Sequence, residues 1–303
     1  MANLWNLGGL SPARLARNVW RAIDRDDILG HAAKLSYYFL LALVPLLLLL
    51  TTLFGYFAQS ADLRTDLLEY FRRVVPRSAF QLVVNTLDEV SSGAGGGKLS
   101  LGIIGTLWAA SAGMAAIIRG LNQAYQVDDE RPWWKLRMVA AGLTLAFAVF
   151  TLVALMLVLA GSAVGRFIAG RFGYEALFVS IWNIVRWPIA LFLVLIAIDL
   201  LYRFAPDLRR VKWQWVTPGA AVAVTLWITA SLGFRMYLRF FNTYATTYGS
   251  LGAVIILMLW LYVTSAAILI GAEVNSEIES AAARSGDRDA RLPGEREPHR
   301  RAA

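Results

Sequence analysis

The sequence has 303 residues, of which 58% are hydrophobic and 17% charged, and its formal net charge is +8. Soluble domains are typically about 45–50% apolar, so this composition, gathered in long runs, excludes an ordinary water-soluble domain. There is no cysteine and there are only two histidines, His31 and His299, so disulfides, thiol catalysis, histidine triads and multi-histidine metal sites are excluded. We therefore expect a membrane protein with no metal and no cofactor.

Residues 1–30 form a basic amphipathic segment. In SPARLARNVWRAIDRDDILG, Ser11 can cap a helix and Pro12 suits its first turn. Apolar residues recur at helical spacing, opposite a row of arginines, at Leu15, Val19 and Ile23. The segment has no apolar core of the kind found in cleaved signal peptides. It predicts an interfacial helix that lies along the inner leaflet.

The region 31–280 predicts an all-α integral membrane protein, a bundle of six transmembrane helices. Each candidate has the roughly 20 predominantly apolar residues that a membrane-spanning helix needs. The six spans are expected at about 33–58, 99–125, 138–165, 178–201, 215–239 and 249–275.

Three further segments are predicted to lie outside the lipid. Residues 59–98 carry two amphipathic patterns and end in SSGAGGG, which indicates a helical extracytoplasmic hairpin, either a lid over a cavity or a pair of helices on the membrane surface. The acidic run 128–130, next to Arg131, is interpreted as a solvated loop rather than a metal site. Residues 281–303 are charged and lack periodicity, so a disordered cytoplasmic tail is expected.

The distribution of positive charge gives an orientation. Most of the 29 Lys and Arg fall in the N-terminal segment, the second and fourth connections between spans, and the C-terminal tail. The positive-inside rule therefore predicts cytoplasmic N- and C-termini in the bacterial inner membrane. In a membrane protein the basic balance indicates attraction to anionic headgroups, and no nucleic-acid partner is expected.

One arginine is predicted inside the fourth span. Arg186 is followed by Pro188, which can open the helix, and Asn183 lies one turn earlier, so a polar notch is expected there. Two interpretations stay open: Arg186 fixes helix packing, or it faces a cavity and holds an anionic group such as a phosphate. The other candidate substrate-binding residues are expected at a similar level: Arg235, Arg239, Tyr244 and Tyr248.

A second polar group is predicted at the cytoplasmic ends of the spans, where it would form ion pairs that close the bundle or an inner gate. Asp199 and Arg203 have i, i+4 spacing, and Glu273 is expected to meet Arg119 or Lys34. The whole candidate group is Lys34, Arg119, Asn122, Asp199, Arg203, Glu273 and Asn275. Small residues such as Ala267 and Gly271 predict close helix contacts, with packing inside one chain as the default.

Four stretches resemble a known family: AAKLSYYFLLALVPLLLLLTTLFGYFA, SAGMAAIIRGLNQAYQV, LLYRFAPD followed by TPGA, and TYGSLGAVIILMLWLYVTSAAILIGAEVNSEIE. They are similar to the BrkB/YihY family of bacterial inner-membrane proteins, formerly mislabelled ribonuclease BN. The resemblance implies a six-helix integral membrane protein and supplies no established catalytic residue.

These observations favour a non-enzymatic inner-membrane protein. The first hypothesis is a transporter or flippase-like protein that binds an anionic amphiphile, a phospholipid or lipid-linked envelope precursor, in an arginine-containing cavity. The alternative is a non-transporting scaffold that recruits envelope-assembly proteins through its hairpin and tail. A membrane nuclease ranks third, because no catalytic carboxylate cluster is identifiable.

Overall fold

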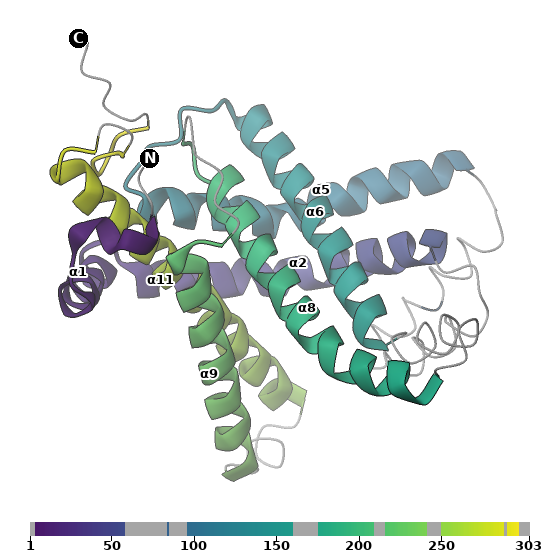
Figure 1. The fold of residues 1–303 in the computed structure, drawn as a ribbon. Helices are drawn as coiled ribbons and strands as arrows, with labels where there is room; N and C mark the ends of the chain where they lie inside the picture. The colour runs from purple at the N-terminus through teal and green to yellow at the C-terminus, as the bar shows by residue number, and fades with distance from the viewer. Residues whose placement is uncertain are drawn as a thin grey trace. The chain divides into compact units, whose positions relative to one another are not determined.

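The computed structural model describes residues 4–57, 84, 96–159, 175–208, 216–240, 250–287 and 290–296. Over these residues all the regular elements are helices, as the sequence predicts (Figure 1). They are η1 (Leu4–Gly9), α1 (Pro12–Arg25), α2 (Ile28–Phe57), α5 (Gly96–Ala124), α6 (Trp133–Leu159), α8 (Glu175–Phe204), α9 (Pro218–Phe240) and α11 (Ser250–Arg284). The predicted hairpin at 59–98 falls outside the described residues apart from residue 84 and the start of α5.

Five helices in the described part of the chain are long and apolar enough to cross a membrane. Their candidate spans are Ile104–Ala124, Trp133–Ala154, Ile184–Phe204, Pro218–Tyr237 and Val254–Arg284. The helix α2 contributes a shorter apolar stretch, Ile28–Leu43, so the expected count of six spans is not confirmed. Within the described residues the all-helical prediction is confirmed, and the five long apolar helices are consistent with a multi-pass membrane protein.

The chain divides into two compact units, and each is described by itself. The first unit comprises Met1–Leu41, Ala112–Leu143 and Leu195–Ala303, and the second comprises Ala42–Ser111 and Thr144–Val194. In the second unit, α8 exposes large apolar side chains at helical spacing, among them Ile181, Ile184, Trp187 and Leu191. A face of this kind suits contact with lipid.

The helix α1 begins as the sequence predicts, but its apolar face has a protein partner. The Ser11 hydroxyl accepts the N–H of Arg14 at 3.4 Å, and Pro12 is the first helical residue. Val19 is buried with Val274 and Ile278 of α11, and Leu15 and Ile23 pack against this cluster. The face that the sequence assigns to the inner leaflet is therefore covered by α11.

The helices α9 and α11 lie side by side in the first unit, with their backbones in contact (Figure 1). A Cβ at Gly219 would overlap the carbonyl oxygen of Gly271, and a Cβ at Gly271 would overlap that of Gly219. The close contact predicted for Gly271 is thus found within one chain. From α8, the Tyr202 hydroxyl donates to the Ile268 carbonyl at 2.6 Å, which joins a third helix to this pair.

The predicted disordered tail is ordered where the structure describes it. Residues 281–284 are the last turn of α11. Beyond them, Arg291 is buried and donates two hydrogen bonds to Glu279, at 2.8 and 2.7 Å. The sequence has no periodicity here because this segment is held by side-chain pairs rather than by an apolar helical face.

Candidate functional site

Polar side chains of the first unit gather in three groups. The first, called the loop network, consists of Asn122, Asp129, Glu130, Arg131, Asp207 and Arg296. Asn122 Nδ2 donates to Asp129 at 2.9 Å, and its Oδ1 accepts the Asp207 N–H at 2.8 Å. Arg131 donates to both oxygens of Asp129, at 2.8 and 2.6 Å. One amide and one guanidinium thus tie the α5–α6 connection to the segment that follows α8.

The loop network also includes the C-terminal segment. Arg296 pairs with Asp207 and with Glu130. Burial acts to raise the pKa of Asp129, but its bonds from Arg131 and Asn122 outweigh burial and hold that pKa below its usual range. The interpretation of run 128–130 as solvated is therefore wrong for Asp129, whose side chain is 15% exposed.

The second group, called the capping cluster, consists of Asp199, Thr217, Gly219 and Asn275. The carboxylate of Asp199 accepts the Thr217 hydroxyl at 2.5 Å and the Thr217 N–H at 3.1 Å. Thr217 Oγ1 accepts the N–H of Ala220, so Thr217 caps the start of α9. Asn275 donates to Thr217 at 3.0 Å and accepts the Gly219 N–H at 2.8 Å. Asp199 therefore binds the residue that caps the start of α9, and its expected pairing with Arg203 is not found.

The third group lies at the contact of α1 with α11 and consists of Arg25, Asp26, Glu273 and Glu277. Arg25 donates to Asp26 at 2.7 Å and lies 3.7 Å from Glu277. The pKa of Arg25 is raised by its bond to Asp26 and by the charges of Glu277 and Glu273. Gln126 Nε2 also donates to Asp26, at 2.9 Å.

Glu273 is fully buried, and neither of its carboxyl oxygens has a hydrogen-bond partner among the described residues. The expected ion pair with Arg119 or Lys34 is not found, because both of those residues are exposed. The guanidinium of Arg119 instead lies 5.7 Å from the ring centre of Tyr38. The full burial of Glu273 explains the difference, since long cations keep their charged ends in water.

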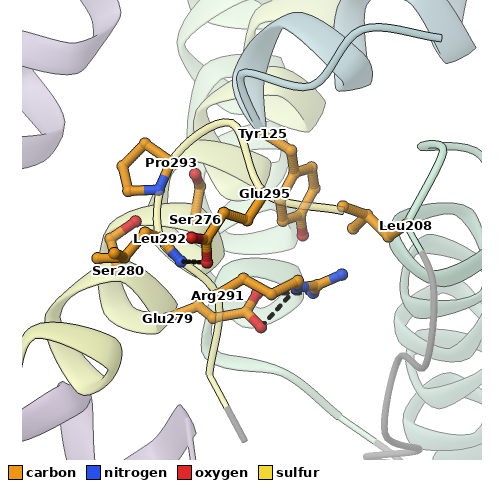
Figure 2. A pocket seen from close by; sticks show the side chains of 9 residues that line it. All are labelled: Tyr125, Leu208, Ser276, Glu279, Ser280, Arg291, Leu292, Pro293 and Glu295. Atoms are coloured by element: carbon orange, nitrogen blue, oxygen red, sulfur yellow. Dashed lines mark hydrogen bonds and ion pairs between the residues drawn. The ribbon is translucent and has the colours of Figure 1, made fainter. Parts of the chain in front are cut away.

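A small polar pocket lies where the C-terminal segment folds back on α11 (Figure 2). Its walls include Tyr125, Ser276, Glu279, Arg291 and Glu295. The Glu279–Arg291 pair closes one side, and Glu295 accepts the N–H of Leu292 at 3.0 Å (Figure 2). Burial raises the pKa of the Tyr125 phenol, so this wall stays neutral at physiological pH.

The predicted outer notch is only partly described. Arg186 is half-buried on α8, and its guanidinium lies 5.7 Å from the ring centre of Trp187. Arg235 is exposed on α9. The side chains of Asn183 and Arg239, and the whole of Tyr244 and Tyr248, lie outside the description. The notch as an assembled binding site stays a prediction.

The sequence reasoning missed several residues that form these groups. Thr217, Asp207 and Arg296 were not selected, although Thr217 directly precedes a proline, which is a helix-start pattern. Asp207 and Arg296 carry no such local signal, because they pair across 89 residues of sequence. Among the described residues, no three acidic or histidine side chains are grouped so that they could hold a metal ion.

Comparison with known proteins gives consistent matches. Residues 19–293 match the family model described as "Virulence factor BrkB". The "Putative ribonuclease-like protein YfkH" of Bacillus subtilis is 38% identical over 81% of this chain and 88% of its own length. A "UPF0761 membrane protein" of Tolumonas auensis is 29% identical over 89% of this chain and 86% of its own length. No solved structure matches.

Proposed function

Because the chain belongs to the BrkB family of membrane proteins, we propose that it binds an anionic amphiphile within the membrane and moves it between leaflets. The ligand class is a phospholipid or a lipid-linked envelope precursor. The proposed location is the bacterial inner membrane, with both termini in the cytoplasm. No reaction is proposed for the chain.

The observation that carries this proposal is the position of Arg186. It lies within the candidate span Ile184–Phe204 and is half-buried, with exposed apolar side chains such as Ile184 and Trp187 beside it. An arginine in a membrane span is costly, so it is expected to face protein or a polar ligand rather than acyl chains. Its planar fork suits the oxygens of a phosphate, and its guanidinium lies 5.7 Å from the ring centre of Trp187.

The loop network and the capping cluster support a closed inner end in this proposal. They join the α5–α6 connection, the segment after α8, the start of α9, and α11. Exposed arginines on α1, at Arg14, Arg17 and Arg21, suit contact with anionic headgroups on the cytoplasmic side. Movement of a ligand would then require these polar groups to separate.

Native mass spectrometry of the detergent-purified protein tests the proposal. Wild type is expected to retain an anionic lipid, and Arg186→Ala to lose most of it while staying folded. Arg186→Lys keeps the charge but not the fork, so intermediate retention is expected. Arg284→Ala removes the same charge from the exposed end of α11 and serves as the matched control.

Equal lipid retention by wild type and Arg186→Ala would contradict the proposal. Arg186 would then be a packing residue, and the scaffold hypothesis would take first place. A vesicle-based flipping assay with a labelled phospholipid follows only if retention depends on Arg186.

A further inference from the structure

Among the described residues of the first unit, Glu273 is the buried acidic side chain that has no hydrogen bond or ion pair. Its exposed fraction is 0%, and both carboxyl oxygens lack a hydrogen bond within the described part of the chain. A buried polar group without a hydrogen bond costs on the order of 2–7 kcal/mol, and an isolated buried carboxylate costs far more. An ionised Glu273 would therefore need hydrogen-bond donors or a positive charge nearby to offset the cost of burying it.

The charged groups around Glu273 are mostly negative, so they do not stabilise its ionised form. The charged groups that interact electrostatically with Glu273 are Asp26 and Arg25 at the end of α1, and Glu277 one turn further along α11. Arg25 is hydrogen-bonded to Asp26 and paired with Glu277, and Glu273 interacts with it only through longer-range electrostatics. With all three carboxyl groups ionised the group would carry a net charge of −2, and a proton on Glu273 would reduce this to −1.

Other elements that pack on α11 carry cations that are placed elsewhere: Arg291 is bonded to Glu279, and Arg119 of α5 is exposed, 5.7 Å from the ring centre of Tyr38. The segment η1 and the first half of α9 contain no charged residue. From α8, Tyr202 contributes a hydroxyl that is already donated to Ile268. The three carboxyl groups also do not converge as metal ligands, since no such group occurs among the described residues.

We propose that Glu273 is a proton-binding site, occupied in this structure's closed packing of α1 against α11, and that release of the proton loosens this packing. The bound species is H⁺ alone. On release, the O–H bond of the carboxyl breaks, the proton passes to water, and a carboxylate remains beside Asp26 and Glu277. The proton site itself does not depend on the proposed lipid-binding function. A coupling of proton release to lipid movement would rest on that function.

The position of the site explains how proton release would act on packing. Glu273 directly precedes Val274, which is buried with Val19 of α1 and Ile278 of α11. A carboxylate at Glu273 would need water, and water that enters beside Val274 would separate these apolar side chains. Arg25, whose side chain is 52% exposed, lies beside this contact, 3.7 Å from Glu277.

Infrared spectroscopy tests the proton site without any transport assay. At neutral pH, wild type is expected to show a carboxylic-acid C=O band that shifts in D₂O and is lost in Glu273→Gln. Glu277→Gln should retain the band and serves as the matched control on the same helix face. Labelling all glutamates with carboxyl ¹³C shifts the band without any substitution, which covers the case in which a variant does not fold. Absence of a glutamic-acid band in wild type would overturn the proposal.

A thiol-labelling experiment tests the link to packing, because the chain contains no cysteine. Ile278→Cys places a thiol in the α1–α11 contact, and Ser285→Cys provides an exposed reference on the same segment. Raising the pH should increase labelling at position 278 relative to 285 in the wild-type background, and not in Glu273→Gln. Equal ratios in both backgrounds would overturn the link.

The two proposals fail separately. Loss of the infrared result with intact Arg186-dependent lipid retention would leave lipid binding without a proton site. A glutamic-acid band together with lipid retention that ignores Arg186 would leave a proton-sensitive membrane protein of another function.

Discussion

Two carboxyl groups of the first unit, those of Asp199 and Glu273, are both buried but differ in their hydrogen bonds. Asp199 is 8% exposed and accepts the N–H and the hydroxyl of Thr217. Asp199 belongs to α8, but its carboxylate contacts the start of α9, where the helix dipole favours an anion. Glu273 is 0% exposed and accepts nothing from the described residues. Burial alone therefore does not tell a structural carboxylate from a site whose charge can change.

The comparison also separates two kinds of helix contact. Around Asp199, the polar atoms that cap α9 are paired, and the backbones of Gly219 and Gly271 touch. Around Glu273, the contact is made by apolar side chains of α1 and α11 next to an unpaired polar group. We infer that the first contact is rigid and that the second is the one able to open.

The largest expected effect tests the rigidity of the first contact. Gly219→Ala places a methyl group against the Gly271 carbonyl oxygen and the Asn275 side chain. Overpacking against backbone is expected to cost about 3 kcal/mol or more. Gly233→Ala is the matched control on the same helix, because a Cβ there meets nothing within 4 Å. Thermal unfolding in detergent measures both, and a difference below about 0.5 kcal/mol would contradict the close contact.

The next prediction compares the two carboxyl groups directly. Asp199→Asn removes hydrogen bonds to a charged acceptor and should destabilise by about 1.5–3 kcal/mol. Glu273→Gln resembles the protonated side chain and should change stability by less than about 0.5 kcal/mol at neutral pH. Chemical or thermal unfolding of both variants gives the two values. Equal destabilisation would mean that Glu273 is ionised and paired in the folded protein.

The sequence predicts the architecture well because bilayer thickness leaves few alternatives. Long apolar runs in α5, α6, α8, α9 and α11 have the required length and occur where they are expected. The start of α1 is likewise local, since Ser11 and Pro12 determine it. The first predicted span also lies on a helix, because α2 is helical over 30 residues, Ile28–Phe57.

The partners of individual polar residues are not predictable in the same way. The sequence predicts one polar group that includes Asn122, Asp199 and Asn275, whereas the structure has Asn122 in the loop network and the other two in the capping cluster. Their partners lie 7, 18 and 58 residues away. The i, i+4 rule pairs Asp199 with Arg203 because it considers only residues on the same helix. Tertiary contacts with the start of α9 override that local choice.

A smaller effect is expected in the loop network, which is closer to solvent than the capping cluster. Arg296→Ala removes pairs with Asp207 and Glu130, and the Glu130 side chain is 68% exposed. A loss of about 1 kcal/mol is expected, most of it from Asp207. Arg284→Ala, at an exposed position, should be neutral in the same thermal-unfolding assay. A neutral Arg296→Ala would mean that the C-terminal segment is not fastened in solution.

The smallest effect is the pH dependence of the stability that Asp129 contributes. It distinguishes this paired, partly exposed carboxylate from the buried carboxyl groups of Asp199 and Glu273. The pKa of Asp129 is lowered in the folded protein, so its pairing with Arg131 and Asn122 stabilises the fold at pH values above about 3.9, the usual aspartate value. That stabilisation is lost as the pH falls through the lowered pKa, because the protonated group no longer attracts Arg131. Asp129→Asn should therefore be less stable than wild type at neutral pH, and the gap should close in acid. Melting temperatures of both proteins measured across the acidic range check this, and a gap that widens in acid would reverse the assigned sign.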